Sequence, residues 1–279
     1  MNRRRKLKSA PVGVVGKVLR VLELLDRSPE GLQLKDIATL ADLNKSTAHR
    51  LLVHLESGGY LFHDVNGAYM IGPKLVRLGS GTTYQATLRR LSRPVLERLW
   101  RATGETINLS VLDGQDILYI DVLESLHTFR LVSQVGTRRP LHCTALGKAM
   151  LSRMEPDRVE EALAHIRFER TTPKTITSIA QLRKDLKECT ARGFALDDEE
   201  AVSGARCISA PILDADGKVT AALSVSGPIV RVDRAKVPVF SRLIRAAAEE
   251  ISGKLGYIVP AKEKKQTATT KSVAKPRLG

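Results

Sequence analysis

Apolar residues in the first quarter of the chain recur three times with the period of an α-helix. The three sets are Val18, Val21, Leu22 and Leu25; Leu34, Ile37, Ala38 and Ala41; and Ala48, Leu51, Leu52 and Leu55. Spacings of three and four residues place each set on one face of a helix, where it can be buried. Asn44 is a suitable N-cap for the third helix, because its side chain can accept a hydrogen bond from the first turn. We therefore expect three short helices around one small core.

A β-hairpin is expected directly after the third helix. Gly58-Gly59 ends that helix, and the apolar runs 60–63 and 68–71 lie on either side of Asn66-Gly67. Asn-Gly is well suited to a two-residue hairpin turn, since both residues tolerate positive φ. Three helices followed by a hairpin is the order of a winged helix-turn-helix, which we assign to residues 11–72 with the hairpin as the wing.

The outer face of the third helix carries hydrogen-bond donors and no acid before Glu56. Such donors can meet phosphates and base edges when a helix enters a major groove. We expect Arg50 to read a base, and the alternative is an ion pair with a neighbouring acid. The residues that we expect at double-stranded DNA are Lys45, Ser46, Thr47, His49 and Arg50, with Asn66 in the wing and Arg3, Arg4 and Arg5 before the first helix.

The hydrophobic pattern changes after the hairpin. Residues 73–93 indicate a linker helix interrupted at Gly79-Ser80-Gly81, and Pro94 is suited to the first turn of a further helix. Alternating or short apolar runs predict strands at 106–112, 117–123, 129–132, 194–196, 207–213 and 219–226, and helical spacing predicts helices at 142–151, 156–165, 179–192 and 234–255. Because the strands flank the helices instead of alternating with them, we expect an α+β domain with an antiparallel sheet over residues 94–258.

The formal net charge of +15 is unevenly distributed along the chain. Residues 1–8 carry five basic residues and no acid, residues 73–103 carry seven against one, and the tail from Ala261 carries six against one. Residues 9–72 have a net charge of −1, so the affinity of the helix-turn-helix for a polyanion would depend on these flanking segments. We interpret residues 1–10 as a disordered basic arm and residues 259–279 as a disordered basic tail.

Composition excludes several classes of protein. No apolar run approaches the roughly 20 residues of a membrane span, and the basic N-terminus is not followed by the apolar core of a signal peptide. The three cysteines, Cys143, Cys189 and Cys207, are too few and too irregularly spaced for a disulfide framework or a zinc site. We expect a cytoplasmic protein without a metal, a cofactor or a membrane partner.

Three segments of the second domain combine polar residues with apolar strands. They read Pro-Leu-His-Cys-Thr-Ala-Leu-Gly-Lys-Ala at 140–149, Gly-Phe-Ala-Leu-Asp-Asp-Glu-Glu at 193–200 and Ser-Val-Ser-Gly-Pro at 224–228. Together with the helix-turn-helix and Cys207, these motifs resemble the IclR family of bacterial transcriptional regulators, over roughly residues 11–256.

The resemblance implies a winged helix-turn-helix joined by a linker helix to a GAF-like α+β effector-binding domain. It also implies a homodimer or homotetramer that binds palindromic operators. The effector pocket that it implies consists of Leu131, Ala145, Leu146, Asp197, Cys207, Ser224 and Ser226, with Thr128 as a further candidate.

The chemistry of these residues suits a small carboxylate. Ser224 and Ser226 lie on one face of a strand, and free amides at the start of the 142–151 helix can hold an anion. Asp197 could orient a hydroxyl or a water, or could instead cap nearby backbone or pair with Arg206. Cys207 is more typical of a small buried side chain than of a reactive one. The sequence thus predicts a regulator controlled by a small organic or aromatic acid.

Two alternatives remain at this point. A thiol-dependent enzyme could use Cys143 and His142, although side chains of adjacent residues on a helix diverge by about 100°. A non-specific architectural DNA-binding protein could use the basic ends of the chain, but the second domain would then have no purpose. No phosphate loop or nucleophile motif is present, so we do not expect an enzyme.

Overall fold

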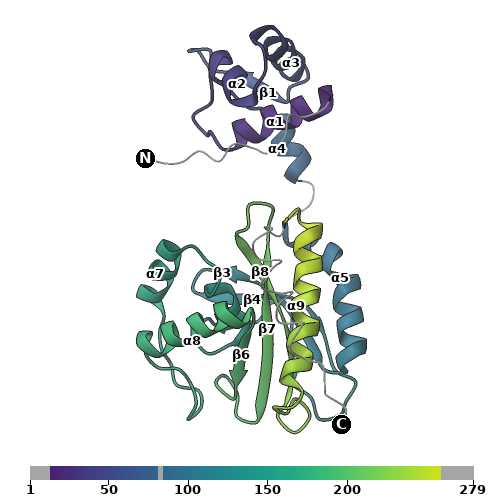
Figure 1. The fold of residues 1–279 in the computed structure, drawn as a ribbon, viewed down its shortest axis with the longest axis vertical. Helices are drawn as coiled ribbons and strands as arrows, with labels where there is room; N and C mark the ends of the chain where they lie inside the picture. The colour runs from purple at the N-terminus through teal and green to yellow at the C-terminus, as the bar shows by residue number, and fades with distance from the viewer. Residues whose placement is uncertain (1–12, 81–83, 259–279) are drawn as a thin grey trace, which may run out of the picture. The chain divides into compact units, whose positions relative to one another are not determined.

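The computed structural model describes residues 13–80 and 84–258. The chain forms two compact units that divide after Tyr84 (Figure 1). Each unit has a hydrophobic core of its own, so each is described separately.

The first unit is a helix-turn-helix with a short hairpin. Its elements are α1 (Val14–Asp26), α2 (Leu34–Ala41), α3 (Lys45–Ser57), β1 (Leu61–His63), β2 (Tyr69–Ile71) and α4 (Pro73–Ser80). The buried core is Val21, Leu25, Ile37, Ala41, Leu52 and Leu61. These residues belong to the predicted apolar stripes or begin the hairpin, which confirms the three helices and the winged helix-turn-helix order.

The wing is the predicted hairpin, closed by a loop of more than two residues. Strands β1 and β2 pair from Leu61 with Ile71 to His63 with Tyr69, which leaves five residues in the loop. The Asp64 carboxylate accepts hydrogen bonds from the backbone N–H groups of Asn66 (2.9 Å) and Ala68 (2.8 Å). These bonds hold a wider loop closed, and they lower the pKa of Asp64. The hairpin predicted around Asn66-Gly67 is therefore present, and an acid at the loop's first position stabilises a connection longer than two residues.

The second unit is a six-stranded antiparallel sheet between two layers of helices (Figure 1). Its elements are α5 (Tyr84–Thr103), β3 (Thr106–Asp113), β4 (Asp116–Leu123), β5 (Arg138–Pro140), α6 (Ala145–Leu151), α7 (Pro156–His165), α8 (Ile179–Arg192), β6 (Ala195–Asp198), β7 (Ala205–Leu213), β8 (Val219–Pro228) and α9 (Val237–Lys254). The strand order is β5-β4-β3-β8-β7-β6. The predicted α+β class and antiparallel sheet are confirmed.

The two faces of the sheet differ in chemistry. Ile107, Leu109 and Val111 of β3 belong to the core that α5 and α9 cover. The residues between them point to the other face, toward α6, because side chains alternate along a strand. Cross-strand pairing then sets small polar residues side by side there, with Asn108 opposite Ser224 and Thr106 opposite Ser226.

Three local predictions were wrong. Residues 129–132 are not a strand; β4 pairs instead with β5 at 138–140. Pro94 does not begin a helix but lies inside α5, which continues through it. The helix expected from His142 begins only at Ala145, after a turn that ends in the N-cap Thr144. Pairing of β4 with β5, packing of α5 on the sheet core and the Thr144 cap decide these three cases against the local pattern.

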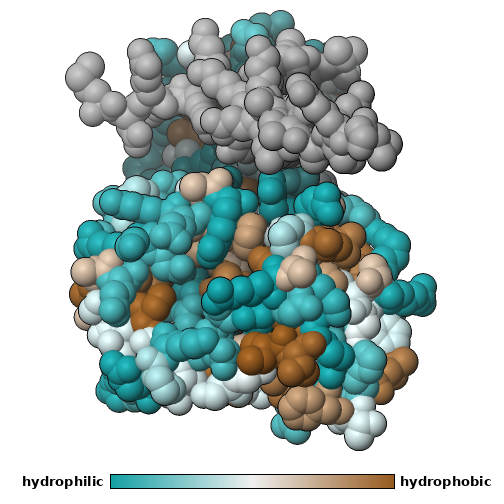
Figure 2. Space-filling view, turned by 60° about the horizontal axis from the view of Figure 1, so that its bottom comes forward, coloured by the Kyte–Doolittle hydropathy of each residue, from teal (hydrophilic) through white to brown (hydrophobic). Residues whose placement is uncertain are grey.

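Figure 2 shows one face of the molecule, on which hydrophilic side chains predominate and hydrophobic ones form separate small patches. Scattered apolar side chains of this kind are usual on protein surfaces. Within the part of the chain that the structure describes, no helix is both long and apolar enough to cross a membrane.

Candidate DNA-binding surface and effector pocket

The predicted recognition helix α3 begins as the sequence indicates. The Asn44 side chain accepts a hydrogen bond from the Thr47 backbone N–H (2.9 Å), which caps the first turn. Ala48, Leu51 and Leu52 are buried in the small core, which turns the opposite face of the helix outward. Lys45, His49 and Arg50 are exposed on that outer face. Among the described residues no carboxylate pairs with Arg50, so the ion pair considered as its alternative role does not form.

The other predicted DNA contacts occupy different positions. Ser46 is exposed and its hydroxyl donates to the Asn44 carboxamide oxygen (3.1 Å). Thr47 is half-buried. Asn66 is exposed in the wing loop. Arg3, Arg4 and Arg5 lie outside the described residues.

The second unit contains a cavity of about 220 Å³ between the polar face of the sheet and α6. Seven of the eight predicted effector residues line it: Leu131, Ala145, Leu146, Asp197, Cys207, Ser224 and Ser226. They come from strands β6, β7 and β8, from helix α6 and from the segment after β4, so the fold brings together residues far apart in the sequence. Thr128 is exposed and does not line this cavity.

The floor of the cavity is a small hydrogen-bonded cluster of neutral side chains. The Asn108 amide nitrogen donates to the hydroxyl oxygens of Ser224 (3.1 Å) and Ser226 (3.3 Å). The two serine hydroxyls are themselves 3.2 Å apart. All three side chains are buried.

Asp197 is the buried acid of the cavity. It is 2% exposed, and its carboxylate accepts hydrogen bonds from the backbone N–H groups of Glu200 (2.7 Å) and Ala201 (3.3 Å). Burial raises the pKa of Asp197 to about 6, against the opposing effect of Lys148. Arg206 pairs with Asp198 instead (2.5 Å), so the predicted alternative of a local cap is found and the predicted ion pair is not.

The sequence analysis missed five polar lining residues: Asn108, Tyr119, Ser133, Arg139 and Thr144. Burial raises the pKa of Tyr119 to about 12, although the nearby Arg139 opposes the shift. Arg139 is exposed and is the only lysine or arginine among the residues described around the cavity. A signal for Asn108 was present, because β3 alternates the polar Thr106, Asn108 and Ser110 with apolar residues, and polar side chains on a buried strand require partners.

Both units match models of one family. Residues 14–64 match the IclR helix-turn-helix domain, and residues 81–253 match the C-terminal domain of bacterial transcriptional regulator IclR. The chain belongs to the IclR family.

Individual relatives agree with this assignment to the IclR family. The chain is 39% identical over 245 residues to the HTH-type transcriptional regulator BhcR of Paracoccus denitrificans, covering 88% of each chain. The crystal structure of the Thermotoga maritima IclR superposes with a TM-score of 0.61 at 31% identity, covering 87% of this chain and 98% of that one. An IclR homolog from Microbacterium hydrocarbonoxydans, complexed with 4-hydroxybenzoate, gives a TM-score of 0.57 at 28% identity over 86% of this chain and 97% of its own. The chain is thus a transcriptional regulator and not an enzyme.

The chemistry around Cys143 also argues against the thiol enzyme. Burial raises the pKa of Cys143 to about 12 and lowers the pKa of His142, so neither the thiolate nor the imidazolium of a catalytic pair is favoured. The His142 Nε2–H instead donates to the Glu169 carbonyl (3.2 Å). Burial likewise raises the pKa of Cys207. Residues 13–80 and 84–258 contain no group of acids, histidines and cysteines that could hold a metal.

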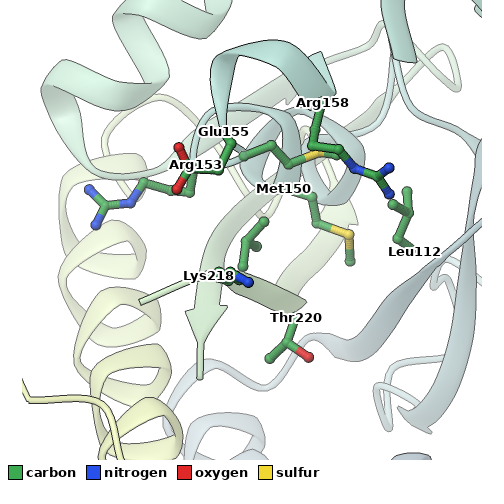
Figure 3. Close-up of a pocket in the computed structure, with 9 residues that line it drawn as sticks. Leu112, Met150, Arg153, Glu155, Arg158, Lys218 and Thr220 are labelled. Carbon is green, nitrogen blue, oxygen red and sulfur yellow. The ribbon is translucent and has the colours of Figure 1, made fainter. Parts of the chain in front are cut away.

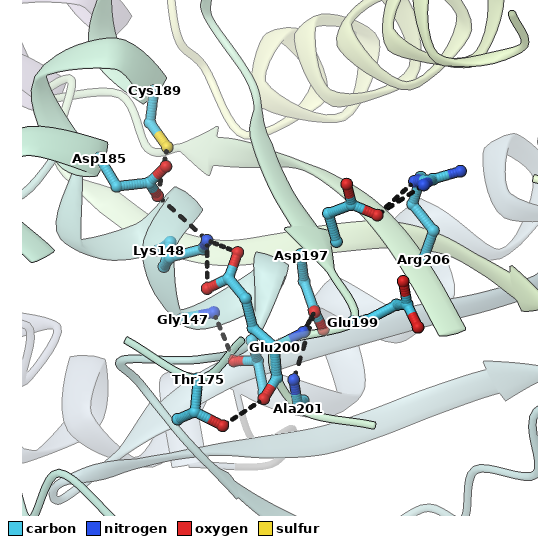
Figure 4. Close-up of polar contacts among 12 residues, drawn as sticks. Gly147, Lys148, Thr175, Asp185, Cys189, Asp197, Glu199, Glu200, Ala201 and Arg206 are labelled. Carbon is cyan, nitrogen blue, oxygen red and sulfur yellow. Dashed lines mark hydrogen bonds and ion pairs between the residues drawn. The ribbon is translucent and has the colours of Figure 1, made fainter. Parts of the chain in front are cut away.

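Behind the cavity of this IclR regulator, a buried lysine is held by two acids (Figure 4). Lys148 of α6 is fully buried and forms ion pairs with Glu200 (2.6 Å) and with Asp185 of α8 (3.0 Å). The two carboxylates keep the pKa of Lys148 raised despite its burial. Burial raises the pKa of Glu200 to about 7 even with this partner. The Glu200 backbone N–H also donates to the Asp197 carboxylate, so the cluster around Lys148 helps to hold Asp197 in place at the cavity.

A second cavity, of about 170 Å³, lies at the end of α6 (Figure 3). Leu112, Met150, Met154 and Val219 make it largely apolar, and its remaining lining residues are Arg153, Glu155, Arg158, Lys218 and Thr220. It contains none of the predicted effector residues. None of its polar side chains is buried, so it lacks the fixed polar groups that orient a ligand in a specific site.

Proposed function

We propose that this IclR-family chain binds operator DNA through α3 and a small carboxylate in the cavity beneath α6, and that the carboxylate changes the affinity for DNA. The observation that carries the proposal is the cavity itself. It joins a neutral hydrogen-bonding floor, a buried acid and one rim arginine, Arg139, inside the unit that contains no DNA-binding motif. The homolog solved with 4-hydroxybenzoate supports a carboxylate as ligand.

The effector-binding residues that we propose are the seven that line the cavity, with Asn108, Tyr119, Arg139 and Thr144 in addition. On the DNA side we propose Lys45, Ser46, Thr47, His49 and Arg50, together with Asn66 and the arginines at positions 3–5. A homodimer or homotetramer would place two copies of α3 in major grooves about 34 Å apart, which requires a palindromic operator.

Two measurements test the proposed function. Footprinting of the purified chain on the DNA upstream of its own and neighbouring genes should reveal a protected palindrome. A thermal-shift screen of small aliphatic and aromatic carboxylates should find a compound that raises the melting temperature, because a ligand stabilises the state that binds it. Absence of any protected palindrome would overturn the DNA part, and absence of any stabilising carboxylate would overturn the effector part.

We expect Arg50→Ala to weaken specific operator binding by about 1–3 kcal/mol, because a base contact in the major groove is worth that amount. Binding of the carboxylate should not change, since Arg50 belongs to the other unit. Fluorescence anisotropy with operator DNA and calorimetry with the carboxylate measure the two effects. Lys187→Ala, an exposed cation on α8, is the matched control and should leave both unchanged. Equal loss of both activities in Arg50→Ala would indicate misfolding instead.

Binding of a carboxylate should strengthen about tenfold between pH 7.5 and 5.5. Asp197 has a pKa of about 6, so it is ionised at the higher pH and repels the ligand's negative charge, and it is mostly neutral at the lower pH. Its charged neighbours are Lys148, Asp198 and Glu200, and the neutral side chains of Tyr119, Cys143 and Cys207 also interact with it. Asp197→Asn should bind tightly across the range and lose the pH dependence. The control is Asp157→Asn, which changes an exposed acid of α7 and should behave as the wild type. Calorimetry at both pH values measures the carboxylate affinity. If Asp197→Asn kept the wild-type change of affinity with pH, the expectation would be contradicted.

A further inference from the structure

We propose that Asn108 selects an effector that carries a hydroxyl group as well as a carboxylate, so that the ligand class is a hydroxy carboxylic acid. This inference rests on the proposed carboxylate effector and concerns the end of the effector opposite its carboxylate. It starts from one atom of the cavity floor, the side-chain oxygen of Asn108.

The orientation of the Asn108 side chain is fixed by its neighbours. Its amide nitrogen has two N–H donors, and the structure directs them to the hydroxyl oxygens of Ser224 (3.1 Å) and Ser226 (3.3 Å). The residue is 1% exposed. Both donors are therefore used within the floor, and neither remains for a ligand.

The side-chain oxygen of Asn108 is buried and has no hydrogen-bond partner among the described residues. An unpaired buried acceptor destabilises a protein, and most such atoms in folded proteins have a partner. Asn108 lines the cavity, so a molecule in the cavity can supply the missing donor.

The chemistry of the missing donor restricts the ligand. An ionised carboxylate has acceptors only and cannot satisfy the Asn108 oxygen. A hydroxyl group can, and its own oxygen can accept the hydrogen that one of the two serine hydroxyls still has available. The carboxylate then belongs at the rim, where Arg139 is the cation. A ligand with a hydroxyl at one end and a carboxylate at the other matches both ends of the cavity.

The reverse orientation of the amide predicts a different ligand. If the serine hydroxyls donated to the Asn108 oxygen, its nitrogen would face the cavity and would favour an acceptor such as a keto group. A series of three-carbon acids separates the two orientations: lactate offers a donor, pyruvate an acceptor and propionate neither. Benzoate and 4-hydroxybenzoate form a matched aromatic pair.

The test is calorimetric titration of the full wild-type chain with these five acids. We expect lactate to bind about 10- to 100-fold more tightly than propionate and pyruvate, or 4-hydroxybenzoate to bind more tightly than benzoate by that factor. The reason is that an acid without a hydroxyl group leaves the buried oxygen of Asn108 unpaired. Equal binding within the series, or tighter binding of pyruvate, would overturn the inference while the carboxylate effector stands. Binding of none of the five would overturn both.

Two variants assign the preference to Asn108. In Asn108→Leu the hydroxylated acid should lose its advantage, because the acceptor is gone. The matched control is Ser110→Ala, which removes a buried and unpartnered hydroxyl from the same face of β3 without touching the cavity lining; it should keep the wild-type preference. Should Asn108→Leu fail to fold by circular dichroism, the wild-type series alone decides. A hydroxyl preference that survives in folded Asn108→Leu would overturn the role of Asn108.

Discussion

Replacing Lys148 by alanine should lower the melting temperature of the second unit by about 10 °C. The lysine is fully buried between Glu200 and Asp185. Removing it leaves the Glu200 carboxylate, which is 12% exposed, without its cation, and leaves Asp185 with only a longer contact of 3.9 Å to Arg192. Breaking a buried ion pair in this way costs about 3–5 kcal/mol, and a unit of this size loses about 2–4 °C per kcal/mol. Differential scanning calorimetry at pH 8 measures the change.

The effect of Lys148→Ala should shrink as the pH falls. Burial already raises the pKa of Glu200 to about 7, and loss of the lysine raises it further. A carboxyl group whose pKa is raised on folding contributes stability below its unfolded pKa and loses that contribution as the pH rises through its folded pKa. The variant should therefore be closer to the wild type at pH 5 than at pH 8. A larger deficit at pH 5 would contradict the assignment.

Lys174→Ala is the matched control for Lys148→Ala. Lys174 pairs with Glu199, beside Glu200, but its side chain is 52% exposed. Exposed ion pairs contribute 1 kcal/mol or less, so the melting temperature should fall by about 2 °C at most. Equal losses in the two variants would show that burial of the cluster is not the cause.

Replacing Gly147 by alanine should destabilise the second unit by about 3 kcal/mol or more. A β-carbon at this position would lie 2.4 Å from the carbonyl oxygen of Leu141 and 2.5 Å from its α-carbon. These are backbone atoms, so no side-chain rotation relieves the contact, and the turn before α6 must move. The same turn places Thr144, Ala145 and Leu146 at the cavity, so we also expect carboxylate binding to fall. Chemical denaturation and calorimetric titration measure the two effects.

Gly253→Ala provides the control for Gly147→Ala. Gly253 lies in the last turn of α9, and a β-carbon there meets no atom within 4 Å. Alanine has the higher helix propensity, so this variant should be neutral or up to about 1 kcal/mol more stable. A mild effect of Gly147→Ala, similar to that of the control, would mean that the turn before α6 adapts easily.

The helix-turn-helix could be predicted closely because its signals are local. The apolar spacing of the three helices and the Asn44 cap involve residues within a few turns of each other. For the second unit the fold class was predicted correctly but not every helix and strand, because strand pairing depends on contacts across the whole sheet. Phe129 and Val132 have strand-forming side chains but are 70% and 62% exposed, whereas the Arg-Arg-Pro stretch of β5 pairs with β4. Edge pairing, not propensity, selects the strand.

The same limit explains which cavity residues the sequence could indicate. Ser224, Ser226 and Asp197 lie in the motifs on which the family resemblance rests. Arg139 lies on the misassigned edge strand, so its place at the rim could not be foreseen. Asn108 reaches the serines only through the pairing of β3 with β8, across 116 and 118 residues of sequence. Its importance comes from an unpaired oxygen, and a residue pattern does not reveal which buried atoms lack partners.

Helix α5 is long and is packed along the sheet core. It runs for 20 residues without a break at Pro94, which corresponds to about 30 Å. Leu88, Val95, Leu96 and Leu99 are buried and fasten it to the sheet core. If that core rearranged and the helix followed as a rigid rod, the helix would tilt as a whole. A tilt of about 5° then displaces its far end by about 3 Å, and at Tyr84 that end is where the chain continues toward the first unit.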